Sequence, residues 1–175
     1  MHIRREAPED AQAVDRLVAE AFGAEGESTA DFVRRIRREA EVCLALVAVE
    51  AGEIVGQAQF GAVPIRTPHG PRRGAYFACL SVAPRLHGRG IGSALVQASV
   101  AQLREIEVEV VMVLGSPRYY PRFGFSSELA GRIRAPYSRM GKAFQAIELA
   151  DGALALGGDA DFHPALVSMP EPDAG

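Results

Sequence analysis

The sequence of 175 residues contains only two cysteines, a single lysine and no long apolar run. Cys43 and Cys79 lie far apart in apolar stretches, which favours buried thiols over a disulfide framework or a cysteine-based metal site. The four histidines lack ligand-like spacing, so we expect no metal. The apolar run 108–114 is much shorter than the roughly 18 residues of a membrane span, and residues 1–22 lack the apolar core of a secretory signal. These absences predict a cytoplasmic protein without a membrane partner.

Composition and charge indicate one globular domain that binds a small molecule. Hydrophobic residues make up 48% of the chain and charged residues 23%, which is close to the average for globular proteins and sufficient for one core. The net charge of -3 argues against a broad nucleic-acid-binding face. We therefore expect a single domain over residues 1–168, followed by a disordered tail at 169–175.

Hydrophobic periodicity predicts both helices and strands. The predicted helices cover 11–22, 28–40, 90–105 and a short turn at 117–122, and the predicted strands cover 3–6, 44–49, 53–60, 75–82, 108–114, 132–134 and 144–149. The second helix is expected to begin with a capping box, because Ser28 and Asp31 have the S-x-x-D spacing. Four arginines lie largely opposite the apolar side of this helix: Arg34, Arg35, Arg37 and Arg38. They predict a solvated face rather than a nucleic-acid site.

Three glycines alternate in "HGRGIG", residues 87–92, between a predicted strand and the next helix. Glycine permits positive φ and close approach, and a helix N-terminus presents unpaired N–H donors with a partial positive charge. With Arg85 and Arg89 nearby, this loop predicts a seat for a phosphate or pyrophosphate, against the alternative of an ordinary tight turn. A P-loop is excluded because Ser93 and Ala94, rather than lysine and serine or threonine, stand directly after Gly92, and the dinucleotide fingerprint fails at Ser93.

Two motifs in this order resemble those of the GNAT N-acetyltransferase superfamily. His87-Gly-Arg-Gly90-Ile-Gly92 is similar to its coenzyme A loop, (Q/R)-x-x-G-x-(G/A), with His87 at the usual Gln or Arg position. "YYPRFGF" is similar to its Y-x-x-x-G-F segment, with Tyr120 four residues before Gly124. The phrases "VLGSPRYYPRFGF" and "FQAIEL" resemble the YhbS-like branch in particular. The resemblance implies an α/β, single-domain GNAT-type acyltransferase fold with a mixed central sheet, splayed middle strands and flanking helices.

The same resemblance implies acetyl-CoA as cosubstrate and suggests a role for each matching position. Backbone groups of Leu80, Ser81 and Val82 would bind the pantetheine arm, and the Leu80 N–H would polarise the thioester carbonyl. Tyr120 would contact the cofactor and act as general acid toward the leaving thiolate. The other cofactor contacts would come from the loop residues His87, Gly88, Arg89, Gly90, Ile91, Gly92 and Ser93. Homodimers are common in this family.

The general base stays open, because the strand 75–82 contains no carboxylate. Ser116 could orient a water that accepts the proton of the amine, or Glu25 or Glu27 could accept it directly. Cys79 as a nucleophile is disfavoured by its apolar neighbours. The resulting hypothesis is acetyl transfer from acetyl-CoA to a primary amine of a small molecule or protein, by direct attack in a ternary complex. The alternatives are a non-catalytic acyl-CoA-binding module and, against the acidic net charge, an enzyme acting on RNA-linked amines.

Overall fold

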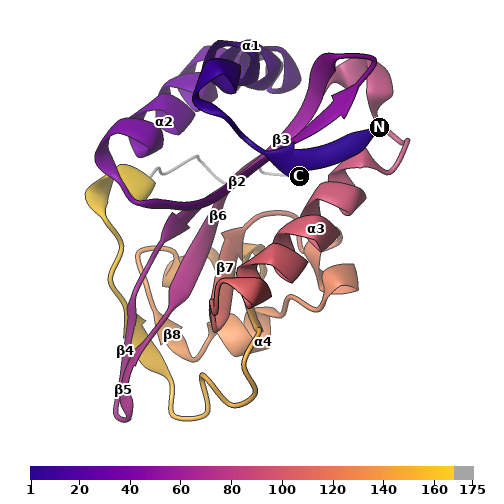
Figure 1. Cartoon of the computed structure of the whole chain (residues 1–175). Coiled ribbons are helices and arrows are strands. Elements are labelled where there is room, and N and C mark those ends of the chain that lie inside the picture. Colours follow the sequence, from indigo (N-terminus) through magenta and orange to yellow (C-terminus); the bar gives the residue numbers. More distant parts are fainter. Residues whose placement is uncertain (168–175) are drawn as a thin grey trace.

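A six-stranded mixed sheet forms the centre of the computed structural model, which describes residues 1–167 (Figure 1). Its strands, in the order β1-β2-β3-β6-β7-β9, are β1 His2–Arg5, β2 Val42–Glu50, β3 Glu53–Ala62, β6 Gly74–Val82, β7 Val110–Leu114 and β9 Phe144–Glu148. All neighbours are antiparallel except β6 and β7, which are parallel. The predicted mixed sheet is therefore confirmed, whereas the predicted domain end at 168 and tail at 169–175 lie outside the described residues.

Helices cover both faces of this sheet (Figure 1). α3 (Ile91–Glu105) packs on one face through Leu95, Val96 and Leu103. On the other face lie α1 (Ala11–Ala21) and α2 (Gly26–Glu39), whose buried residues Val14, Val18, Ala30 and Val33 share a core cluster with residues of β2 and β6. The short helical segments are η1 Pro8–Asp10, η2 Gly23–Glu25, η3 Pro84–Leu86, η4 Tyr120–Phe123, α4 Ser127–Ala130, η5 Ser138–Ala143 and η6 Pro164–Leu166. Within residues 1–167, no helix has both the length and the apolar character needed to cross a membrane.

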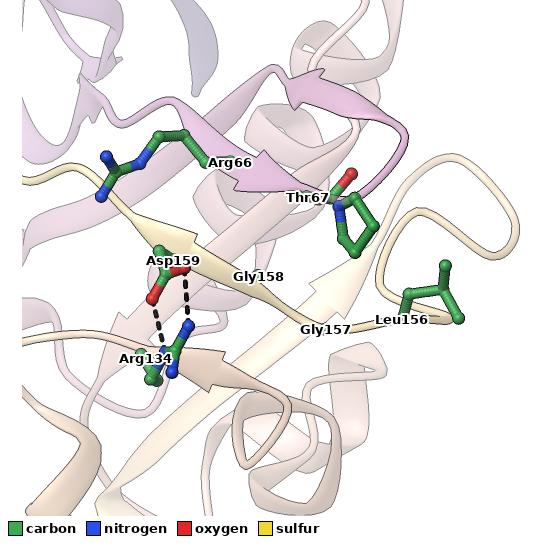
Figure 2. A pocket seen from close by; sticks show the side chains of 8 residues that line it. Arg66, Thr67, Arg134, Leu156, Gly157, Gly158 and Asp159 are labelled. Atoms are coloured by element: carbon green, nitrogen blue, oxygen red, sulfur yellow. Dashed lines mark hydrogen bonds and ion pairs between the residues drawn. The ribbon is translucent and has the colours of Figure 1, made fainter.

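A second, smaller sheet departs from the sequence prediction. Its strands, in order, are β5 Gly70–Arg72, β4 Ile65–Thr67, β10 Gly158–Ala160 and β8 Ile133–Arg134. The segment 64–74 lies outside every predicted helix and strand, yet it forms the β4–β5 hairpin. The prediction missed it because strands of three residues are too short to show a periodicity. A pocket of about 450 Å³ lies beside β4, β8 and β10. Figure 2 shows side chains that line it, and there Arg134 Nη2 donates to Asp159 Oδ2 at 2.8 Å.

The start of α2 also differs from the prediction. The helix begins at Gly26, and Ser28 does not cap it, because its Oγ donates instead to the backbone oxygen of Glu25 (2.9 Å). Gly26 lies so close to α1 that a Cβ there would overlap the carbonyl oxygen of Ala19. The contact between the two helices, rather than a capping side chain, therefore sets where α2 begins.

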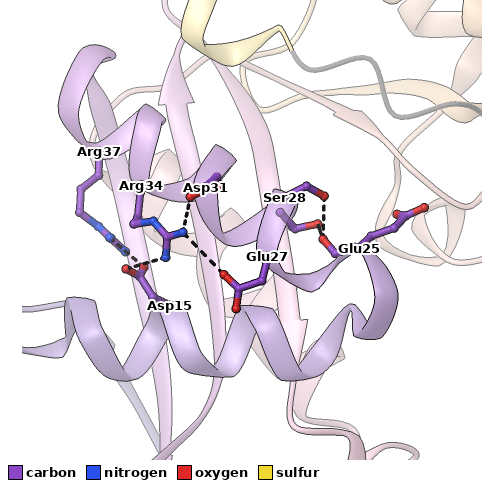
Figure 3. Close-up of polar contacts among 8 residues, drawn as sticks. Asp15, Glu25, Glu27, Ser28, Asp31, Arg34 and Arg37 are labelled. Atoms are coloured by element: carbon purple, nitrogen blue, oxygen red, sulfur yellow. Dashed lines mark hydrogen bonds and ion pairs between the residues drawn. The ribbon is translucent and has the colours of Figure 1, made fainter.

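The arginines of α2 do not form the uniformly solvated face that the sequence predicts. Figure 3 shows that Arg34 and Arg37 reach toward Asp15 of α1, and the Arg37 Nη1 to Asp15 Oδ1 distance is 3.1 Å. Arg37 Nη2 also lies 3.0 Å from Oε1 of the buried Glu6 side chain. Arg38 remains largely exposed. Packing of α1 against α2 brings these acids to the arginines, and the ion pairs hold the two helices together.

Candidate active site

The strands β6 and β7 pair along only part of β6. Their last pair joins Phe77 to Val113, whereas β6 continues to Val82 beside β3. Ala78 has no partner in β3, because the register between the two strands shifts at this point. Such a bulge increases local twist. Within the described residues, no strand pairs with 78–82 on the side of β7, so the predicted splay is confirmed and backbone groups of this segment face an open edge.

The glycine loop leads from this edge into α3. Gly88 and Gly90 have φ of +78° and +81°, a conformation that L side chains rarely adopt, so glycine is required at both positions. Gly90 precedes the first residue of α3, and no side chain caps the N–H groups of the first turn. A Cβ on Gly92 would lie 2.9 Å from the Tyr119 hydroxyl oxygen, so the absence of a side chain permits this close approach. The loop therefore has the free donors and open space of an anion site.

A cavity of about 400 Å³, here called the loop cavity, opens at these glycines. Leu80 and Val82 of β6 line it together with six of the seven predicted loop residues: His87, Gly88, Gly90, Ile91, Gly92 and Ser93. His87 Nε2 lies 2.9 Å from the Val82 carbonyl oxygen, so the imidazole covers the end of β6. Ser81 is turned to the other face of the sheet, where Gln57 Nε2 donates to its Oγ (3.1 Å).

The two arginines predicted beside the phosphate are engaged elsewhere. Arg85 pairs with Glu53 (2.7 Å), and Arg89 pairs with Glu50 through both guanidinium Nη atoms (3.2 Å each). Neither side chain lines the loop cavity. These partners lie more than 30 positions away in the sequence, so local pattern could not reveal them.

Arg122 supplies the cation that the sequence analysis missed. It lines the loop cavity, and its guanidinium carbon stands 4.0 Å from the centre of the Tyr119 ring. Within residues 1–167 no carboxylate lies within ion-pair distance of it, whereas Arg85 and Arg89 are both paired. Its place three residues after Tyr119, within η4, is the only sequence signal for this contact.

A larger cavity of about 850 Å³, here called the strand cavity, extends along the separated strands. Leu80 and Tyr119 line both cavities, so the two meet where β6 leaves β7. Tyr120 and Ser116, two predicted site residues, also line the strand cavity. No group of three or more histidine, cysteine or acidic side chains in the described part of the chain is arranged to hold a metal ion.

Tyr120 is buried among aromatic rings at the side of this cavity. Its ring makes edge contacts with Phe77, Tyr119 and Phe125, with centroid distances of 5.9, 5.1 and 5.6 Å. A Cβ on Gly115 would overlap the ring, so glycine at the end of β7 makes room for the tyrosine. Loss of solvent raises the pKa of the Tyr120 phenol above its ordinary value of about 10. The group therefore carries its proton throughout the neutral range.

The three candidates for the general base differ in where they lie relative to the strand cavity. Ser116 is exposed at its edge, and its Oγ accepts the N–H of Arg118 at 3.2 Å. Glu25 lines the cavity. Glu27 does not line it, and its carboxylate lies instead 4.0 Å from Arg34 (Figure 3). Glu25 and a water oriented by Ser116 thus remain as alternatives.

Cys79 lines the strand cavity but lacks the surroundings of a nucleophile. Its thiol lies 3.5 Å from Ser81 Oγ, and burial raises its pKa to about 11. Cys43, on β2, is also largely buried, which raises its pKa to about 11 as well. Thiolate is the reactive form of cysteine, so both side chains are suited to packing rather than to covalent catalysis.

Both thiols are expected to react slowly with iodoacetamide in the folded protein. At pH 8, a pKa near 11 leaves about one thiol in a thousand ionised, against about a quarter for an exposed thiol. We therefore predict labelling of the native chain at least about 100-fold slower than labelling in denaturant, measured by mass spectrometry. Rapid native modification of Cys79 with loss of activity would instead support a covalent acyl-cysteine intermediate.

Comparison with known proteins agrees with this geometry. The family profile described as an acetyltransferase (GNAT) domain matches residues 2–127. The uncharacterised N-acetyltransferase YhbS of Escherichia coli K12 is 32% identical over 155 residues, 88% of this chain and 90% of YhbS. The structure of E. coli YhbS in complex with CoA has a TM-score of 0.86 and 29% identity, covering 97% of this chain and 93% of that one. A GNAT acetyltransferase from Brucella melitensis in complex with acetyl-CoA has a TM-score of 0.73 and 28% identity, covering 95% and 97%.

The matches extend over the whole site. The family profile includes β6, the glycine loop, α3, β7 and the Tyr120 motif, all of which lie between residues 74 and 125. The curated relative is named as an N-acetyltransferase, which favours an enzyme over a non-catalytic binding module. Motifs, fold and comparisons therefore agree that the chain belongs to the GNAT family of N-acetyltransferases.

Proposed function

We propose that this protein transfers an acetyl group from acetyl-CoA to a primary amine by direct attack within a ternary complex. The observation that carries this proposal is the meeting of the two cavities at Leu80 and Tyr119, where β6 and β7 separate. A thioester placed at this junction can have its CoA part in the loop cavity and its acyl carbon exposed to the strand cavity. The CoA and acetyl-CoA held by the two similar structures support the choice of donor.

The loop cavity has the groups that an anionic donor needs. Backbone N–H groups of Gly90 to Ser93 would receive the pyrophosphate, and Arg122 would add the nearby positive charge. The open edge of β6 would bind the pantetheine amides through backbone groups of Leu80 and Val82. This assignment keeps the predicted loop contacts but places Arg122, rather than the side chains of Arg85 and Arg89, beside the phosphate.

The reaction requires stabilisation of an oxyanion and protonation of a thiolate. The amine nitrogen attacks the thioester carbonyl, the C–S bond breaks, and the backbone N–H of Leu80 would donate to the developing oxyanion. Tyr120 would then donate its proton to the leaving sulfur. Burial raises the pKa of a thiol in the same surroundings, to about 11 for Cys79, so a desolvated CoA thiolate would be a stronger base than one in water.

The amine must lose a proton before or during the attack. A lysine-like amine has a pKa of about 10.4, so less than about one molecule in a thousand is neutral at pH 7. β6 contains no carboxylate, and Glu25 is the acidic side chain that lines the strand cavity. We propose that the proton leaves through Glu25 or through a water held by Ser116.

Thermal unfolding with separate ligands tests the donor site. A ligand at 100 times its Kd adds about 2.7 kcal/mol to stability, which for a chain of this size raises Tm by roughly 5–10 °C. We expect this shift with acetyl-CoA and with CoA, and no comparable shift with NAD or ATP. A larger shift with NAD, or none with CoA, would remove the proposal.

A matched pair of arginine variants locates the phosphate. Loss of one charge-assisted hydrogen bond in Arg122→Gln is expected to raise the Kd for CoA about tenfold or more. Arg118→Gln removes the same charge from an exposed position that lines neither cavity, and should leave the Kd within about twofold. Equal effects of the two substitutions would indicate general electrostatic attraction rather than a contact of Arg122.

A further inference from the structure

Aromatic side chains are the largest group in the walls of the strand cavity, and they bear on the identity of the acceptor if the proposed function holds. Six of the lining residues carry an aromatic ring: Phe22, Phe32, Tyr76, Phe77, Tyr119 and Tyr120. They come from both sides of the open edge, because Phe22 and Phe32 belong to the α1–α2 region and the others to β6 and the segment after β7. A cavity of about 850 Å³ with such walls is larger than an acetyl group and a simple alkylamine require.

The strand cavity has an acidic side chain in its lining and, in the described part of the chain, no basic one. Among residues 1–167, Glu25 is the only acidic side chain that lines it, and no arginine, lysine or histidine does. Within residues 1–167 no cationic group lies within ion-pair distance of the Glu25 carboxylate, and Figure 3 shows this side chain directed away from Arg34. The hydroxyl groups of Ser28 and Thr29 donate to the backbone oxygen of Glu25 (2.9 and 2.8 Å), which fixes the turn that carries it.

Phe22 lies close in sequence to Glu25, at the end of α1. Its side chain is 39% exposed and is one of few large apolar side chains in the described chain that remain so exposed. Exposed aromatic surface at the rim of a cavity is typical of a ligand-binding position. The same short connection therefore offers an aromatic face and a carboxylate to a molecule that enters the strand cavity.

We propose that the acceptor is a primary amine on an aromatic or similarly apolar body without a carboxylate or phosphate group, the arylalkylamine class. Glu25 attracts the ammonium form at the entrance, and the rings of Phe22 and Phe32 cover the apolar body. An acceptor with an acidic group would place an unpaired anion beside apolar walls and Glu25, which is unfavourable. An aliphatic amine of a few carbons would leave most of the aromatic wall without a contact.

Three amines that differ by one feature each test this assignment in the full-length protein. 2-Phenylethylamine has both features, phenylalanine adds a carboxylate, and propylamine lacks the ring. With saturating acetyl-CoA, we expect kcat/KM for 2-phenylethylamine to exceed each of the other two by at least about tenfold, measured by CoA release and by mass spectrometry of the product. Comparable values for phenylalanine or propylamine would overturn the assignment.

Two pairs of variants assign the preference to residues. Phe22→Ala should raise KM for 2-phenylethylamine about tenfold with little effect on KM for propylamine. The control is Leu156→Ala, because Leu156 is another exposed apolar side chain but lies beside the small sheet (Figure 2); it should change neither KM.

Glu25→Gln should reduce the discrimination against phenylalanine at least about fivefold. The control is Glu27→Gln, because the Glu27 side chain is more than four-fifths exposed and lies outside the cavity; it should preserve the discrimination. Identical behaviour within either pair contradicts the role given to Phe22 or Glu25.

The outcomes separate this inference from the proposed function on which it rests. Turnover of amines without the expected preference removes the inference and leaves the acetyltransferase reaction in place. Binding of acetyl-CoA without turnover of any of a wide range of amines removes both. A kcat/KM that rises from acetyl-CoA to hexanoyl-CoA, with no preference among the amines, would show that the aromatic walls bind the acyl chain instead.

Discussion

Replacing Tyr120 with phenylalanine is expected to lower kcat about 100-fold or more while the Kd for acetyl-CoA stays within about twofold. The substitution keeps the ring that packs against Phe77 and Phe125 and removes only the hydroxyl that would protonate the leaving sulfur. Loss of a positioned general acid typically reduces a rate by 10²–10⁴. Steady-state kinetics with a responsive amine, together with calorimetric titration of acetyl-CoA, would measure the two quantities separately.

The pH dependence and a neighbouring variant provide the controls. Because burial raises the pKa of Tyr120, its phenol stays protonated in neutral and mildly alkaline solution, so it should cause no fall of kcat below about pH 10. A fall of kcat near pH 8 would show that another group is the acid. Tyr119 stands beside Tyr120 and lines both cavities. If Tyr119→Phe abolishes turnover and Tyr120→Phe does not, the role belongs to Tyr119.

Replacing Gly26 with alanine is expected to lower the free energy of unfolding by about 3 kcal/mol or more. A Cβ at this buried position would overlap the backbone carbonyl oxygen of Ala19, and backbone atoms move only if the two helices separate. Overpacking of this kind typically costs about 1–3 kcal/mol and more where the obstacle is rigid. Separation of α1 from α2 would also displace Phe22 and Glu25, so affinity for the acceptor should fall. Urea unfolding with a comparison of m-values would measure the change in stability.

Two opposing expectations make this substitution informative. Gly26 has ordinary helical φ, so helix propensity alone would make alanine more stable by up to about 1 kcal/mol. A stabilised variant would therefore contradict the close contact with Ala19. Gly23→Ala is the control, because Gly23 has a φ of +54° and nothing within 4 Å of the added methyl group. Its backbone strain alone should cost about 1–2 kcal/mol.

The sequence by itself determined the family and the centre of the site. The glycines at 88 and 90 are a local requirement of the backbone, since both have positive φ, whereas Gly92 makes room for Tyr119 of a later segment. Tyr120 follows the end of β7 at a fixed interval for a similar reason, because Gly115 makes room for its ring. Constraints of this kind act over a few residues, so they are visible in the order of the letters. The long helices were predictable because each buries one regular face, and the long strands because they are apolar runs, which β3 and β7 bury on both faces.

Only the tertiary structure decided which charged side chains are free to contact a ligand. Arg85 and Arg89 resemble phosphate ligands in the sequence, yet packing places Glu53 and Glu50 beside them, whereas Arg122 at the loop cavity has no acidic partner among residues 1–167. The small sheet was equally hidden, because its short strands join segments distant in the chain. The choice between Glu25 and Glu27 also depends on packing, since only the tertiary structure places Glu25, and not Glu27, in the lining of the strand cavity beside β6. An ion pair depends on distance in space, which the sequence alone does not contain.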